Sequence, residues 1–260
     1  MDLTSTDPSS RTLMDFRDYL LDCGACVVGV ADLAAWPGSR TNGYRRAVSL
    51  GVALRPDPIL NLRVRQDRPA EADRPAYAAL AELAQIAIQC LEQLGAKGEV
   101  LVPRDDPEAL THEEVAVQAG VAWIGKSGRP VTWDFGTAIR LTTVLTDADL
   151  PLDQPVKQSF CGACLACTEA CVAHAPSGVI WTRGMKKADF FNETACAERR
   201  RQLAALGRDC RYCMKSFDAN SGSIAPALYM SWNFCMTAFI PGSVVPNTTS
   251  PLAFLTTRLG

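Results

Sequence analysis

Apolar side chains recur at helical spacing in two parts of the first hundred residues. The first part is short and includes Phe16 and Leu20. The second runs from about residue 76 to residue 94 and is closed by Gly95. Its apolar positions form a single stripe that includes Cys90. We therefore expect a long amphipathic helix in which Cys90 is a small core residue rather than a ligand.

Short runs of β-branched and apolar residues indicate strands. They are CVVGVADL, AVSLGVAL, GEVLVP and TAIRLTTVLTD, at residues 26–33, 47–54, 98–103 and 137–147. A short helix is expected at THEEVAVQAG, because Thr111 and Glu114 have the spacing of a capping box. This succession of helices and strands predicts an α+β domain.

The composition changes in the second half of the chain. The segment LPLDQPV, at residues 150–156, is punctuated by prolines and is typical of a linker. Residues 1–155 are expected to form the α+β domain. Residues 156–260 are expected to form a second, cysteine-rich module with short loops and the basic helix AERRRQLAALG.

The overall composition is that of an ordinary globular protein, with 48% hydrophobic and 21% charged residues among 260. A formal net charge of −2 argues against binding nucleic acid through bulk electrostatics. No apolar run is as long as the roughly 18 residues that a membrane span requires. The start lacks the order of a secretion signal, so we expect a cytoplasmic protein without a membrane partner.

The cysteines carry the clearest chemical signal, since seven of the 11 lie within residues 161–213. Such a dense group of reduced thiols indicates metal binding. Cys161, Cys164, Cys167 and Cys171 have the C-x2-C-x2-C-x3-C spacing of bacterial ferredoxins. In this pattern a tight loop holds three corners of an iron–sulfur cubane, and the fourth cysteine points to a second cluster. The alternative is structural zinc, whose sites usually pair two separated C-x2-C knuckles.

A second cysteine set supports two [4Fe-4S] clusters. Cys196, Cys210 and Cys213 would complete a cubane together with Cys171. The first cluster then needs one more ligand, and Phe217 stands where a regular second motif would supply it. Cys235 is our candidate. A non-cysteine ligand, a three-iron cluster and an open iron remain as alternatives, as does a buried thiol at this position. Two clusters in series indicate electron transfer.

Three further motifs could carry chemistry. Asp106 follows a predicted strand, where either a solvated turn or a catalytic carboxylate is usual. Lys126 and Ser127 lie in a glycine-flanked turn, whose N–H groups could hold an anionic or amide-rich ligand. Cys23 and Cys26 form C-x2-C, which suits either a redox pair or simple packing at the start of a strand.

The order of these motifs resembles a known family. AGVAWIGKSG, then GTAIRLTTVLTDADLPLDQPV, then CGACLACTEAC is similar to the epoxyqueuosine reductases and, more loosely, to the reductive dehalogenases. The resemblance implies a nitroreductase-like corrinoid-binding domain followed by a ferredoxin-like iron–sulfur module. It also implies that electrons pass through two [4Fe-4S] clusters to the cobalt of a bound cobalamin, where the substrate is reduced.

The resemblance also assigns site residues. Counting back from the AGVAWIGK segment places Asp106 at the position of the family's catalytic acid, which would protonate the substrate. Such a role requires a carboxyl group kept close to neutral by burial. The family's corrinoid-lining segment corresponds to four residues here, which are Trp123, Gly125, Lys126 and Ser127.

Several features depart from the family pattern. Val172 replaces the proline that usually follows the fourth cysteine, and the chain stops at Gly260 without the helical repeats that assist tRNA binding in longer members. We therefore expect a small-molecule substrate and a reduced ferredoxin- or flavodoxin-type electron donor. A corrinoid-handling or cobalamin-reducing protein, and an iron–sulfur electron carrier without a corrinoid, are the alternatives.

Overall fold

The computed structural model describes residues 16–54, 73–104, 106, 108–210 and 212–215. The strands are β1 (Val27–Asp32), β2 (Arg46–Ala53), β3 (Gly98–Val100), β4 (Trp123–Ile124), β5 (Pro130–Val131) and β6 (Ile139–Thr146). The helices are α2 (Gly38–Thr41), α5 (Arg74–Gln93), α6 (His112–Gln118), α7 (Ala166–Ala170), α8 (Glu193–Ala204) and α9 (Tyr212–Lys215). A turn of 3-10 helix covers Lys187–Asp189, and residues 16–22 are also helical.

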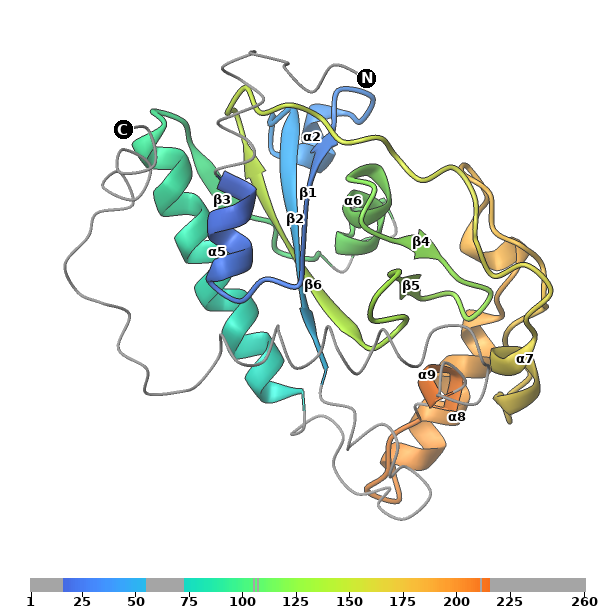
Figure 1. Cartoon of the computed structure of the whole chain (residues 1–260). Helices are drawn as coiled ribbons and strands as arrows, with labels where there is room; N and C mark the ends of the chain where they lie inside the picture. The colour runs from blue at the N-terminus through green and yellow to red at the C-terminus, as the bar shows by residue number, and fades with distance from the viewer. Residues whose placement is uncertain (1–15, 55–72, 105, 107, 211, 216–260) are drawn as a thin grey trace, which may run out of the picture.

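Four strands form an antiparallel sheet in the order β1-β2-β6-β3 (Figure 1). In its register Val48 lies opposite both Val30 and Val144. Because β2 and β6 are central and covered on both faces, almost all of their residues are buried. The strand expected at residues 98–103 is shorter than predicted and ends at Val100.

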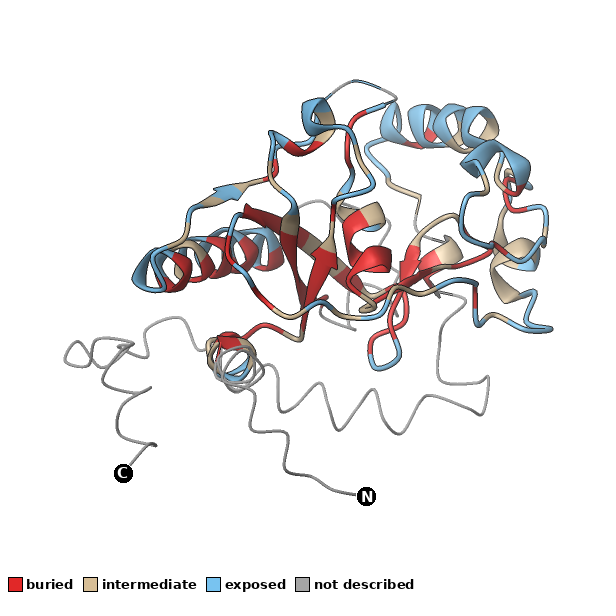
Figure 2. Ribbon diagram, turned by 90° about the horizontal axis from the view of Figure 1, so that it is seen from above, coloured by how far each residue is buried: buried red, intermediate tan, exposed pale blue. Residues whose placement is uncertain are grey.

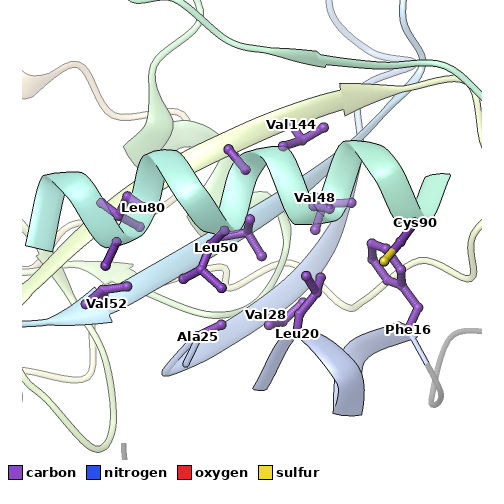
Figure 3. Close-up of a cluster of buried hydrophobic side chains, with 14 of the residues drawn as sticks. Phe16, Leu20, Ala25, Val28, Val48, Leu50, Val52, Leu80, Cys90 and Val144 are labelled. Atoms are coloured by element: carbon purple, nitrogen blue, oxygen red, sulfur yellow. The ribbon is translucent and has the colours of Figure 1, made fainter. Parts of the chain in front are cut away.

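Helix α5 and the helix at residues 16–22 cover one face of this sheet (Figures 1 and 3). The apolar stripe of α5 packs on Val48, Leu50 and Val144, and Leu83 is only 1% exposed. Full burial of one leucine stabilises the fold by about 2 kcal/mol. Cys90 lies within this cluster as predicted.

Helix α6 covers the opposite face. The capping box is present as predicted, with the Thr111 hydroxyl accepting from the Glu114 N–H while the Glu114 side chain accepts from the N–H of Thr111. The helix lies so close to β1 that a Cβ atom on Gly29 would be 2.5 Å from the carbonyl oxygen of Ala119. Glycine in the middle of β1 therefore allows the helix to approach the sheet.

The cysteine-rich part consists mostly of irregular chain with short helices, and much of it is exposed (Figure 2). It packs on the sheet domain through an apolar cluster that joins Val117 to Trp181 and Phe190. Met214 of α9 belongs to the large core cluster, and its carbonyl accepts from the Thr137 hydroxyl at 3.5 Å. The boundary at residue 155 stays a prediction.

The mixed helix-and-sheet class is confirmed. Among the described residues, no helix combines the length and apolar character needed to span a bilayer.

Candidate iron–sulfur and ligand-binding site

The first cysteine loop is organised by its own backbone. The Cys161 N–H donates to the Ser159 hydroxyl at 3.3 Å, and the Cys164 N–H donates to the Cys161 carbonyl at 3.0 Å. Cys167 follows in α7, and burial raises the pKa of its thiol. The hydrogen bond with the Thr168 side chain lowers this pKa, whereas the nearby Cys161 and Cys164 thiolates raise it further. The structure thus brings the first three cysteines of the motif together. Cys164 is the exposed member.

The second cysteine set comes from three separate elements. Cys171 ends α7, Cys196 lies in the first turns of α8, and Cys213 lies in α9. Burial raises the pKa of the Cys213 thiol to about 11; the Arg129 guanidinium lowers it, and thiolates at Cys210, Cys196 and Cys171 raise it. These four thiols therefore lie close enough to interact electrostatically, which is the grouping expected from the sequence.

The donor set fits iron–sulfur clusters. None of the seven described cysteines of the two sets forms a disulfide, and the Ala175 N–H donates to the Cys171 sulfur at 3.5 Å. Backbone N–H donors to sulfur are usual around such clusters. In the described part of the chain, no three His, Cys, Asp or Glu side chains converge as ligands for a single ion. Cys235 lies outside the described residues, so its role stays a prediction.

A cavity of about 1040 Å³ lies between the sheet domain and the cysteine-rich part. One wall is formed by α5 and β6, and the opposite wall includes all four thiols of the second cysteine set. Ligand sites usually measure about 300–1,000 Å³, so this cavity suits a large ligand. A ligand bound here would lie directly beside the second set.

A largely buried ion pair forms part of the cavity wall. The Arg140 guanidinium on β6 donates to the Asp73 carboxylate at 2.6 Å, and the two side chains are only 12% and 5% exposed. A second bond from Arg140 to the Ile139 carbonyl fixes its orientation. This pair could not be predicted from the sequence, because 67 residues separate its members and no motif marks either one.

His112, at the first turn of α6, also lines the cavity and was not predicted as a site residue. Its Nδ1 lies 3.0 Å from the Thr143 hydroxyl, which fixes the ring on the sheet. Burial lowers the pKa of His112, while the adjacent Glu113 opposes this shift. The imidazole is therefore neutral at pH 7, and its tautomer decides whether it donates or accepts a hydrogen bond.

The segment expected to line a corrinoid forms the hairpin of β4 and β5. Ser127 in its turn lines the cavity, and its role in holding a corrinoid stays a prediction. Lys126 instead points to the first cysteine loop, and its ammonium donates to the Gly162 and Cys164 carbonyls. Gly125 and Trp123 are likewise not among the lining residues; Trp123 packs among aromatic rings, 4.7 Å from Trp133 between centroids.

Asp106 lies in an exposed turn that precedes α6. Its carboxylate accepts from the Glu108 N–H at 2.9 Å, and it is not among the residues that line the cavity. The burial that we expected for a proton donor is therefore not seen. Its catalytic role stays a prediction.

Cys23 and Cys26 do not form a disulfide with each other, because Cys23 is a free thiol. Burial raises the pKa of Cys23, which disfavours its reactive thiolate. The Cys26 sulfur accepts from the Ala53 N–H at 3.3 Å. Cys26 is itself disulfide-bonded, though not to Cys23, so the two cysteines of this C-x2-C motif are not joined as a redox pair.

Curated proteins provide the comparison with named relatives. An epoxyqueuosine reductase of Synechococcus sp. strain RCC307 is 41% identical over 66 residues, which are 25% of this chain and 20% of the relative. A tetrachloroethene reductive dehalogenase of Desulfitobacterium hafniense is also 41% identical over 66 residues, covering 24% and 12%. The expected resemblance is confirmed. These relatives are named reductases, but the match spans only a fifth or less of their length, and no family model matches the chain.

Solved structures agree on the fold. A reductive dehalogenase superposes with a TM-score of 0.64 at 16% identity, covering 92% of this chain and 35% of that one. The epoxyqueuosine reductase from Streptococcus thermophilus superposes with a TM-score of 0.52 at 18% identity, covering 82% and 67%. At these identities the likeness concerns the fold alone.

Proposed function

We propose that this protein is an iron–sulfur, cobalamin-dependent oxidoreductase that reduces a small molecule in the cavity beside the second cysteine set. The observation that carries the proposal is that Cys171, Cys196 and Cys213 line the same cavity as His112 and Arg140. Electrons held by the second set would therefore reach a bound ligand without crossing a layer of protein. The named reductases among the relatives support this reaction class.

A finer description of the fold belongs to the same proposal. Residues 1–155 would be a nitroreductase-like corrinoid-binding domain, and residues 156–260 a ferredoxin-like module with two [4Fe-4S] clusters. The volume of the cavity supports a ligand as large as a corrinoid, and one structural neighbour is described in terms of B12-dependent dehalogenation. A bound corrinoid would supply the metal through which electrons pass to the substrate.

The residues of the chain would bind and orient the ligand. Ser127 and His112 offer hydrogen bonds from two sides of the cavity, and the ion pair of Arg140 with Asp73 provides a rigid polar wall. We retain Asp106 as the proposed proton donor. Its support is its position in the turn that leads into α6, whose first residue lines the cavity.

The electron donor is proposed to be an acidic one-electron carrier of the ferredoxin or flavodoxin type. Around the exposed Cys164, the side chains of Phe160 and Leu165 are 51% and 45% exposed, and Lys157 is an exposed cation shortly before them in the chain. An apolar patch with a basic neighbour suits an acidic partner. Reduction by such a donor should slow as salt is raised, and a rate independent of salt would argue against this surface.

A small substrate is proposed rather than tRNA, although one structural neighbour was solved with a tRNA stem loop. The net charge of −2 supports this choice. A reducing compartment such as the cytoplasm is proposed, because iron–sulfur clusters are held by reduced cysteine thiolates.

The test is to purify the full chain without oxygen, with and without added cobalamin, and to measure its iron and its visible spectrum. We expect about eight irons per chain, as two [4Fe-4S] clusters require, together with corrinoid absorption bands. Iron without corrinoid bands would favour the electron carrier instead. Protein that contains zinc, or no iron, would overturn the proposal.

Asp106→Asn then separates a reductase from a corrinoid-handling protein. If Asp106 is the acid, the variant keeps its iron and corrinoid spectrum and still reduces cobalt, but loses substrate turnover. Unchanged turnover in this variant would remove Asp106 from the proposal. A protein that reduces cobalt and turns over no substrate in any assay would be a corrinoid-handling protein.

A further inference from the structure

Lys126 is a buried cation whose hydrogen-bond partners are main-chain oxygens. The residue is only 4% exposed. Its Nζ donates to the Gly162 carbonyl at 2.8 Å and to the Cys164 carbonyl at 3.0 Å, across 36 and 38 residues of chain. It therefore lies on the inner side of the loop that carries Cys161 and Cys164.

The hairpin turn holds this ammonium in place. The Gly125 N–H donates to the Arg129 carbonyl and the Gly128 N–H to the Gly125 carbonyl, each at 2.9 Å. A Cβ atom on Gly125 would lie 2.7 Å from a methyl carbon of Val131, so the turn is tightly packed. The position of Lys126 is thus set by main-chain bonds rather than by a flexible surface loop.

The charge of Lys126 is not balanced within the described part of the protein. None of the salt bridges found there includes it. The two carbonyls satisfy two of the three ammonium N–H donors but carry no net charge. Burial of a charge without an opposite charge is unfavourable, so the site is suited to an anionic group at the neighbouring loop.

We propose that Lys126 is the counter-charge of the iron–sulfur cluster held by Cys161, Cys164 and Cys167, and that it fixes their loop. This inference rests on the proposed function, since it requires a cluster at that loop. A cluster bound by thiolates is anionic, and its reduction by one electron from the donor adds another negative charge. A fixed cation beside it stabilises the reduced form more than the oxidised form, and so raises the reduction potential.

The assignment differs from the role that the family resemblance suggested for this lysine. It would be a positioning residue for the first cluster rather than part of a corrinoid pocket. Loss of the Lys126 charge should therefore change the reduction potential of the first cluster and leave that of the second cluster unchanged.

The experiment is a potentiometric titration of the anaerobically reconstituted full chain, followed by electron paramagnetic resonance. Lys126→Gln keeps an amide donor for the carbonyls but removes the charge. We expect its first cluster to become at least tenfold harder to reduce, which is about 59 mV for a one-electron couple. Lys126→Arg keeps the charge and should keep the potential close to that of the wild type.

Lys97→Gln is the matched control, because it removes the same charge from an exposed lysine ahead of β3. This control should leave the reduction potentials of both clusters unchanged. If Lys126→Gln prevents loading of the first cluster, iron analysis replaces the titration. Retention of that iron in Lys126→Arg would then support the role of the Lys126 charge, and equal loss of iron in both variants would overturn that role.

The outcomes distinguish the two proposals. Wild-type protein that binds no iron would overturn the proposed function and this inference together. Wild-type protein loaded with iron, combined with an unchanged potential in Lys126→Gln, would overturn the inference alone.

Discussion

Two cations with little exposure near the candidate site have different partners, and this difference determines what each can do. The Arg140 guanidinium is compensated by the Asp73 carboxylate at 2.6 Å. Lys126 is held by carbonyl oxygens alone. Arg140 is therefore suited to form a rigid wall of the cavity, whereas Lys126 is suited to stabilise negative charge that arrives with a bound group.

At the same scale, His112 gives a prediction about pH. Burial lowers its pKa in the folded protein below the ordinary value of about 6.5. As pH falls below that value, the unfolded chain takes up the proton before the folded protein does, so the free energy of unfolding decreases on acidification. This loss ends once the pH is below the folded pKa.

We expect wild-type protein to lose more stability than His112→Asn between pH 7.5 and pH 5. Urea denaturation across this range measures the difference, in which the contributions of the other titrating groups cancel. Stability curves that stay parallel for the two proteins would contradict the prediction. A constant offset between them would reflect only the lost contact with the Thr143 hydroxyl.

At the scale of elements, α6 connects the fold to the site. Its capping box fixes the point where the helix begins, and that point places His112 against the cavity. Glu114 of the same box also accepts from the Arg40 guanidinium at 3.1 Å, which ties the helix start to α2. Loss of the capping box or of the contact with Arg40 is therefore expected to affect both the stability of the protein and the shape of the cavity.

Thr111→Ala should lower the free energy of unfolding by about 1 kcal/mol, because the Glu114 N–H loses its acceptor. Thr111→Ser retains the hydroxyl and should be close to the wild type. Urea denaturation at one fixed pH is the measurement. Equal stability of the alanine and serine variants would show that the cap contributes nothing.

Local pattern predicted most of these elements. Helix α5, the strands β1, β2 and β6 and the cap of α6 all lie close to their expected positions, because periodicity and capping depend on neighbours in the chain. The strand β3 was overestimated, since only Gly98–Val100 pairs with β6. Beyond Val100, the Leu101 N–H still donates to the Thr143 carbonyl of β6 at 2.9 Å, but the described residues that follow do not continue the strand.

At the scale of the whole molecule, the second cysteine set joins three elements that are separate in sequence. Cys171, Cys196 and Cys213 come from α7, α8 and α9, and Met214 next to Cys213 packs into the large core cluster. A cluster bound there would therefore connect the cysteine-rich part to the core of the sheet domain. Metal binding and folding should be coupled.

Cys213→Ser is expected to lose about half of the bound iron, because only one of two cubanes depends on this thiol. It should also lower the melting temperature of the reconstituted protein. Cys90→Ala is the control for the loss of a cysteine, since Cys90 is a buried core residue that belongs to neither set. Full iron content in Cys213→Ser, or equal iron loss in Cys90→Ala, would contradict the assignment.

The sequence by itself determined the elements and the division of the cysteines into two sets, because both follow from spacing along the chain. It did not determine the direction in which the β4–β5 hairpin presents Lys126, nor the pairing of Arg140 with Asp73. These contacts join residues 36 to 67 positions apart, and they depend on how the elements pack. Tertiary structure alone decided which polar groups face the cavity and which face the first cysteine loop.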